Sequence, residues 1–125
     1  MQCNNIIRND YIEPDTTRMI KQIIKKYDAV FQVFVNGKIY IERKHYNAVK
    51  RNSSSSLDHD YILRYTTPVY GVIQILDVFE KRIEKVRVDS WRKTDLVKMQ
   101  KELQGLSQIK VKAFDDFIEI HSANA

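Results

Sequence analysis

The sequence of 125 residues contains a single cysteine, Cys3, near its amino terminus. One thiol allows neither a disulfide within the chain nor a zinc site built from the cysteines of one chain. Such scarcity is typical of proteins in a reducing compartment. We therefore expect an intracellular, cytoplasmic protein.

Long apolar stretches are also absent. No apolar run approaches the roughly 20 residues of a membrane-spanning helix, and the opening MQCNNIIRNDY lacks the apolar core of a signal peptide. Glycine occurs only three times, at isolated positions, so the sequence has no glycine-rich phosphate-binding loop. These absences predict a soluble protein without a membrane partner.

The chain is basic. Lysine and arginine outnumber aspartate and glutamate by 21 to 16, which gives a net charge of +5. This balance favours an acidic partner such as nucleic acid. The excess of Ile, Lys, Asn and Tyr is typical of an AT-rich genome and indicates a viral or mobile-element origin. At this length, residues 1–125 should form one domain with a core of its own.

The strongest structural signal lies between residues 28 and 44. Two β-rich runs, 30–35 and 38–43, flank Asn36-Gly37, the dipeptide best able to adopt the positive φ angles of a type I′ hairpin turn. A two-residue turn fixes the register, so Val35 should face Lys38. One face of the hairpin then carries Val30, Gln32, Phe34, Ile39 and Ile41, and the other carries Phe31, Val33, Val35, Tyr40 and Glu42. Both faces need cover, because a lone hairpin is marginally stable in water.

Other periodic segments flank this hairpin. Apolar residues at helical spacing predict a helix over 16–27, after the start signal Pro14-Asp15-Thr16-Thr17. A later helix should be capped by Asp89-Ser90 or Thr94-Asp95 and end near Gly105. Residues 108–114 and 117–121 are expected to form a second hairpin, in which Lys112 lies opposite Glu119.

The segments between these elements carry weaker patterns. Residues 1–13 are expected to form an extended arm, and residues 51–57, which contain four consecutive serines, a flexible loop. Residues 57–65 favour a short helix that Thr66-Thr67-Pro68 would break. The pattern of residues 69–89 fits either two strands or a helix that ends in a short strand, and we favour the helix.

These elements together indicate an α+β fold. We expect an antiparallel sheet made of two or more hairpins, with helices packed mainly on one face. Residues 16–43 and 94–121 both follow the order helix, strand, tight turn, strand. This order predicts two α-β-β units in one sheet, as a repeat of pattern rather than of residues.

Nucleic-acid binding is the function that the basic residues favour. Lys and Arg neutralise phosphates, and aromatic rings can stack on unpaired bases. One stripe lies on the expected first helix and one cluster follows the first hairpin, with two tyrosines nearby. The candidate residues are Arg18, Lys21, Lys25, Lys26, Arg43, Lys44, Lys50, Arg51, Tyr40 and Tyr46.

A protein-binding inhibitor or adaptor is the main alternative. In this interpretation the apolar hairpin face with Phe31, Val33 and Tyr40 contacts a protein partner, or a second copy of the chain in a homodimer. Neither interpretation requires a cofactor.

A second alternative is a Mg²⁺-dependent nuclease. Asp28 opens one strand of the first hairpin, and Glu42-Arg43-Lys44 closes the other as an acid-x-Lys triplet. Two carboxylates can share Mg²⁺ while a lysine stabilises the charged phosphate. This stretch resembles the hairpin of the PD-(D/E)xK nucleases. The resemblance implies metal-binding roles for Asp28 and Glu42 and a catalytic role for Lys44, although Tyr27 stands where that family usually has proline.

Overall fold

The structure is a computed structural model that describes residues 11–27, 29–51, 59–71 and 83–123. Within these ranges the helices are α1 (Pro14–Ile24), α2 (Arg43–Arg51), α3 (His59–Tyr65) and α5 (Lys93–Leu103). The strands are β1 (Ala29–Val35), β2 (Lys38–Glu42), β3 (Thr66–Val69), β4 (Ile83–Ser90), β5 (Ile109–Ala113) and β6 (Phe117–Ser122). The α+β class predicted from the sequence is confirmed.

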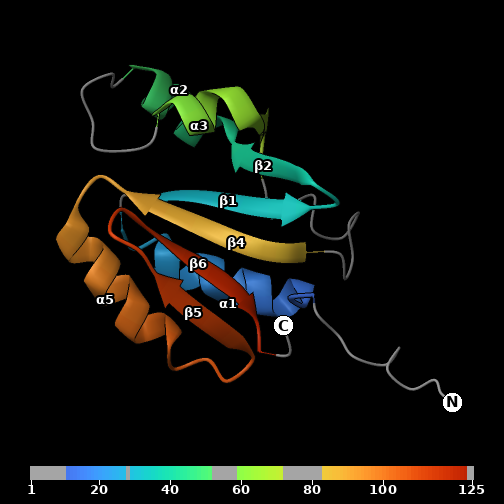
Figure 1. The fold of residues 1–125 in the computed structure, drawn as a ribbon, viewed down its shortest axis with the longest axis vertical. Coiled ribbons are helices and arrows are strands. Elements are labelled where there is room, and N and C mark those ends of the chain that lie inside the picture. Colours follow the sequence, from blue (N-terminus) through green and yellow to red (C-terminus); the bar gives the residue numbers. More distant parts are fainter. Residues whose placement is uncertain (1–10, 28, 52–58, 72–82, 124–125) are drawn as a thin grey trace, which may run out of the picture.

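The strands form one six-stranded sheet in the order β3-β2-β1-β4-β6-β5 (Figure 1). Neighbouring strands are antiparallel except for β2 and β3, which run in parallel. The sheet is therefore mixed, with the two expected hairpins joined by β4 and one parallel strand added at the edge.

The first hairpin has the predicted register. Val35 lies opposite Lys38, and Phe34 opposite Ile39. Asn36 and Gly37 have φ angles of 52° and 78°, as a type I′ turn requires. An added Cβ at Gly37 would meet nothing within 4 Å, so the turn needs glycine for its backbone angle rather than for space.

The larger hydrophobic cluster lies between the sheet and helices α1 and α5. Ile20 and Ile24 of α1 and Met99 of α5 are buried there against Phe31 and Val33. Phe31 and Val33 are 0% exposed, and Tyr40 packs against the same cluster. This corrects the expectation that their hairpin face meets a protein partner or a second copy, because that face is already covered within the chain, with α1 against β1.

Helices α2 and α3 lie on the opposite face, near β1 and β2. Val49 of α2 and Ile62 of α3 pack there against Val30 and Ile41 in a smaller cluster. Figure 1 shows this pair of helices at the β2 end of the molecule, far from α5. Both faces of the first hairpin thus receive the cover that its apolar residues require.

Two elements were not predicted. Residues 43–51 form α2, and Thr66-Thr67-Pro68, expected to be a break, lies in strand β3. Proline is tolerated there because β3 is an edge strand, where a missing N–H leaves no gap in the interior of the sheet.

The expected helix within 69–89 is corrected at its end. Ile83 and Val86, within the segment for which we favoured a helix, lie in strand β4 between β1 and β6. The short closing strand predicted at Val86 is therefore part of a strand of eight residues. Residues 72–82 lie outside the described ranges.

The second α-β-β unit is confirmed. Helix α5 precedes the hairpin of β5 and β6, in which Lys112 lies opposite Glu119, and the Phe114 N–H donates to the Phe117 carbonyl at 2.9 Å. Neither predicted helix cap forms. The N-cap of α5 is Arg92, without a side-chain hydrogen bond, and the Ser90 hydroxyl instead accepts a hydrogen bond from the Arg92 N–H at 3.1 Å.

The end of the expected arm joins the core. The Ile12 N–H donates to the Ile83 carbonyl at 2.8 Å, and Ile12 is 2% exposed. Residues 1–10 of the arm and 52–57 of the serine loop lie outside the described residues. Among the helices that the structure describes, none has the length and apolar character needed to cross a membrane.

The sheet face opposite α1 and α5 carries a buried polar network. Arg87 donates two hydrogen bonds to the Asp89 carboxylate, from Nε at 2.8 Å and from Nη2 at 3.0 Å. The Gln32 amide donates to the same carboxylate at 2.8 Å. The Arg87 guanidinium lies 4.4 Å from the ring centroid of Tyr61 and 3.8 Å from that of Phe117. Charge pairing and ring contacts compensate the cost of burying this arginine.

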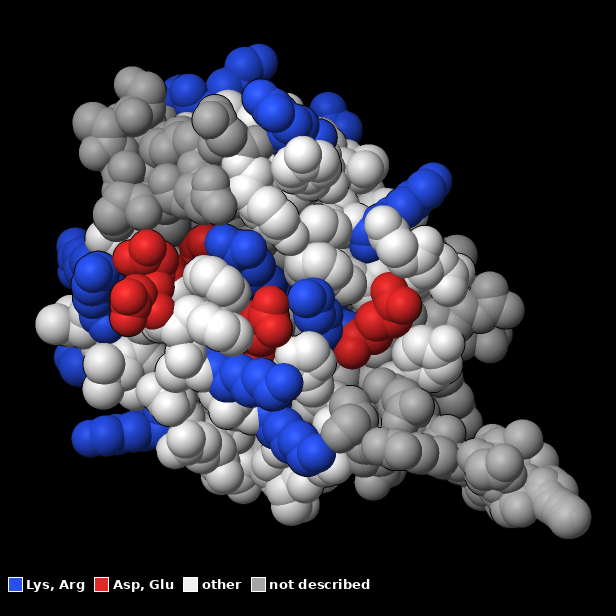
Figure 2. Space-filling view, viewed as in Figure 1, with Lys and Arg blue, Asp and Glu red and all other residues white. Residues whose placement is uncertain are grey.

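Charges of both signs continue across this face. Lys85 donates to Glu119 at 3.3 Å, and His121 Nε2 lies 3.2 Å from the other oxygen of Glu119. Burial would raise the pKa of Glu119, but the hydrogen bond from His121 and the charge of Lys85 outweigh it and lower that pKa. Figure 2 shows acidic and basic side chains interspersed over the middle of this view, with further basic ones around its edges.

Candidate functional site

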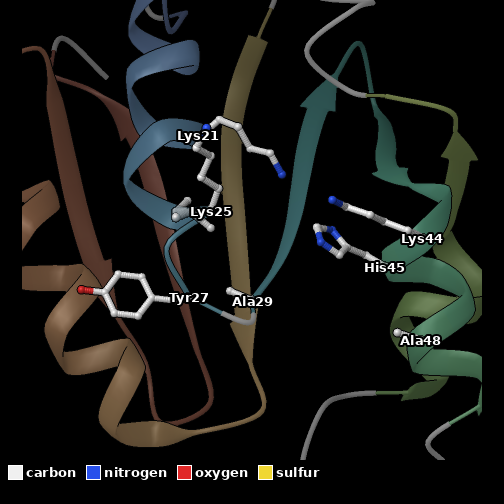
Figure 3. A pocket seen from close by; sticks show the side chains of 8 residues that line it. Lys21, Lys25, Tyr27, Ala29, Lys44, His45 and Ala48 are labelled. Atoms are coloured by element: carbon white, nitrogen blue, oxygen red, sulfur yellow. The ribbon is translucent and has the colours of Figure 1, made fainter.

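A cavity of about 320 Å³ lies where α1, the start of β1 and α2 approach one another. Figure 3 shows side chains of α1 on one side of β1 and side chains of α2 on the other. The cavity is lined by Lys21, Ile24, Lys25, Tyr27, Ala29, Lys44, His45 and Ala48. Basic side chains dominate its polar lining.

Helix α1 supplies one wall because it is amphipathic. Ile20 and Ile24 point into the core, while Lys21 and Lys25 lie one turn apart on the flank of the helix. Ala29, at the start of β1, is small and buried, and leaves room at the base of the cavity.

Helix α2 supplies the opposite wall because it begins directly after β2. Lys44 and His45 are in its first turn, and Ala48 follows one turn after Lys44. The first turn of α2 has no acidic residue, so the partial positive charge of its N-terminus adds to that of Lys44.

Glu42 connects the two walls. Its Oε1 accepts a hydrogen bond from Lys21 Nζ at 2.9 Å and lies 3.7 Å from His45 Nδ1. Burial would raise the pKa of Glu42, but the hydrogen bond and charge of Lys21 outweigh it, with contributions from His45 and Lys44, and the pKa is lowered. The carboxylate is thus ionised at neutral pH and compensates Lys21.

The charge that remains in the cavity is positive. Lys21 is bound to Glu42 and lies 5.0 Å from the centroid of the Phe31 ring. Lys25 and Lys44 are exposed, and neither forms an ion pair with another residue that the structure describes. Two ammonium groups that line one cavity both attract an anion that enters it.

The structure separates the predicted basic stripe into different environments. Arg18 pairs with Asp15 at 2.9 Å, and Lys26 hydrogen-bonds Glu102 on α5. Only Lys21 and Lys25 of the stripe line the cavity.

The predicted cluster after the hairpin lies mainly on α2. Arg43, Lys50 and Arg51 are exposed on this helix with Lys44. Tyr40 packs against the core, and the Tyr46 hydroxyl donates to the Leu63 carbonyl at 3.5 Å. Both tyrosines are half-buried.

His45 is the site residue that the sequence analysis missed. Its spacing from Glu42, three residues along the chain, places the two side chains on adjacent positions where β2 passes into α2. That spacing could have indicated the contact, but only if the helix had been predicted.

The nuclease alternative rests on a geometry that the structure shows only in part. Glu42 ends β2 and is bound to Lys21, whereas Lys44 belongs to α2. The acid-x-Lys triplet therefore bends from strand into helix rather than closing a strand. Asp28 lies outside the described residues, within which no group of three His, Cys, Asp or Glu side chains could hold a metal ion.

Comparisons with known proteins found similar folds but no similar sequences. No family model matches the chain, and no curated protein matches it. The Thermotoga maritima protein TM0651 has a TM-score of 0.65 at 17% identity, over 92% of this chain and 40% of its own. A haloacid dehalogenase-like hydrolase from Bacteroides thetaiotaomicron has a TM-score of 0.63 at 11% identity, over 91% of this chain and 40% of its own. A haloacid dehalogenase-like hydrolase from B. subtilis has a TM-score of 0.62 at 13% identity, over 92% of this chain and 46% of its own. The chain thus spans less than half the length of these structures, and identities this low show a common fold alone.

This likeness corrects the classification that composition predicted. We expected a nucleic-acid-binding protein of viral or mobile-element origin, whereas the structures with this fold include haloacid dehalogenase-like hydrolases. A positive net charge describes a surface and not a fold, so it could not have indicated this relationship.

Proposed function

We propose that the chain is a substrate-binding part of a hydrolase, and that its cavity binds the phosphate group of a phosphate monoester. The observation that carries the proposal is that Lys25 of α1 and Lys44 of α2 line one cavity, together with the small residues Ala29 and Ala48. The fold likeness to hydrolases supports an enzymatic setting.

Charge balance favours phosphate over a singly charged anion. Glu42 compensates Lys21, which leaves the two ammonium groups of Lys25 and Lys44. A phosphate monoester carries about −1.5 to −2 charges at neutral pH, close to the charge of these two groups. Its oxygens can accept hydrogen bonds from both lysines at once.

The proposed role is binding and orientation. Lys21 and His45, both held by Glu42, shape the cavity, while Lys25 and Lys44 contact the anion. The groups that attack the ester bond would come from another segment or another subunit, since the chain covers less than half of each hydrolase that it resembles.

Titration with inorganic phosphate, followed by amide chemical shifts in NMR spectra, tests the proposal. We expect shifts at α1 and at the first turn of α2, weakened by added chloride because the charges are exposed. The double variant Lys25→Gln, Lys44→Gln should bind about five- to tenfold more weakly, as expected for the loss of two exposed charge contacts.

The matched control is Lys98→Gln, Lys101→Gln, which removes the same charge from exposed positions on α5. Its phosphate affinity should equal that of the wild type. Equal weakening in both double variants would mean that net charge alone attracts phosphate, and the proposal would then fail.

A further inference from the structure

A second cavity, of about 500 Å³, adjoins the first on the other side of Lys44. It is lined by Glu42, Arg43, Lys44, Asn47 and Tyr70. Lys44 is common to both cavities. The two cavities therefore meet at this side chain.

The parallel pairing of β2 and β3 forms this second cavity. Glu42 pairs with Val69 where both strands end, so the carboxyl ends of β2 and β3 lie next to each other. Arg43 begins α2 at this point, and Tyr70 follows β3. Crevices at the carboxyl ends of parallel strands are frequent ligand sites, and the N-terminus of α2 adds a positive dipole end.

Tyr70 has an unusual exposure. Its side chain is 85% exposed, more than that of any other large apolar or aromatic residue in the described part of the chain. Tyr65, the next most exposed tyrosine, is 59% exposed and packs against Tyr61 with ring centroids 5.7 Å apart. When a flat ligand covers an aromatic ring that was exposed to water, the burial of apolar surface favours binding.

The polar groups beside Tyr70 suit the edge of such a ring. The Asn47 amide can both donate and accept hydrogen bonds, Arg43 can donate, and the Glu42 carboxylate can accept. Polar groups around one aromatic surface are the usual composition of a site for a heteroaromatic group.

We propose that the two cavities bind one ligand, a phosphate monoester of a flat aromatic or heteroaromatic group, with the ring stacked on Tyr70 and the phosphate between Lys25 and Lys44. This inference rests on the proposed function and adds the class of substrate to it. Lys44 lies at the junction and contacts the phosphate from the side nearer the ring.

The test compares phenyl phosphate with methyl phosphate, which have the same charged group and differ in the ring. Wild-type protein should bind phenyl phosphate about fivefold more tightly in NMR titrations, as expected for one exposed stacking contact. Tyr70→Ala should abolish this preference and leave the affinity for methyl phosphate unchanged. Tyr65→Ala, which removes an exposed tyrosine outside both cavities, should retain the preference.

The possible outcomes separate the two proposals. Equal affinity of the wild type for both esters, or a preference that survives Tyr70→Ala, overturns this inference and leaves phosphate binding intact. If neither ester binds, both proposals fail. Because Tyr70 is exposed, we expect the Tyr70→Ala protein to have the same melting temperature as the wild type. An unchanged melting temperature shows that a lost preference for phenyl phosphate does not come from a lost fold.

Discussion

Lys21 and Glu42 form an ion pair of 2.9 Å that joins the middle of α1 to the end of β2. Their side chains are only 13% and 11% exposed, so water and salt screen the pair weakly. Because Glu42 also faces His45, one carboxylate fixes both walls of the candidate cavity. The stability of the fold and the shape of the site are thus connected through this pair.

The first prediction concerns the charge of Glu42. We expect Glu42→Gln to lower the free energy of unfolding by about 1 kcal/mol at neutral pH, because the amide retains a hydrogen-bond acceptor for Lys21 but loses the charge. The pKa of Glu42 is lowered in the folded state. The stability from its charge is therefore present above the unfolded pKa of about 4.3 and is lost as the pH falls through the folded pKa.

Urea unfolding at neutral pH and at about pH 3 measures this effect. The difference between wild type and Glu42→Gln should shrink on acidification, since the stabilising charge of Glu42 is progressively lost as the pH falls towards the lowered pKa of the folded state. A difference of equal size at both pH values would show that the ionised carboxylate contributes nothing.

The second prediction concerns the first hairpin turn. Gly37 has a φ of 78°, so Gly37→Val should cost about 1 kcal/mol or more through backbone strain alone. Asn36→Gly at the neighbouring position, where φ is 52°, is the control and should be nearly neutral. Thermal unfolding of the two variants compares them, and equal melting temperatures would argue against the turn assignment.

The third prediction concerns the core beneath α5. Met99 is 0% exposed, so Met99→Ala should create a cavity and destabilise the fold by about 2 to 5 kcal/mol. Val97, on the same helix, is 54% exposed, and Val97→Ala should change stability by less than about 0.5 kcal/mol. Denaturant unfolding of both variants checks whether α5 packs on the sheet through the face that contains Met99.

The fourth prediction concerns the buried network on β4. Asp89→Asn should destabilise the fold by about 3 kcal/mol, because it leaves the guanidinium of Arg87 buried without a compensating charge. Asp15→Asn also removes a carboxylate from an arginine, but the Asp15 side chain is 93% exposed, and we expect a loss below about 0.5 kcal/mol. Similar losses in the two variants, measured by denaturant unfolding, would contradict the network.

Local patterns sufficed to predict the elements that depend on neighbouring residues. The Asn36-Gly37 turn fixed one hairpin, and alternation on either side of Asp115-Asp116 fixed the other. The apolar spacing of Leu96, Met99 and Leu103 defined α5. Each of these signals lies within a few residues along the chain, where propensity and periodicity are informative.

Elements that depend on distant contacts were missed. Strand β3 exists because Thr66 and Thr67 pair with β2 across a long connection, and parallel pairing leaves no short turn signal in the sequence. Helix α2 is dominated by polar and basic residues and buries only Val49 fully, so few apolar residues mark it in the sequence. The candidate site could not be predicted for the same reason. The sequence analysis placed Lys21 and Lys44 in separate groups, because only the fold shows that they line one cavity.

The two outer strands determine how the sheet can meet other molecules. At one edge, β3 has four residues and includes Pro68, which has no N–H to donate. At the other edge, β5 exposes Lys110 and Lys112. Short, proline-containing or lysine-bearing edges discourage strand-to-strand aggregation. A concentrated solution of the protein should therefore resist forming fibrils, and any larger assembly should be held together by side chains rather than by a continuous sheet.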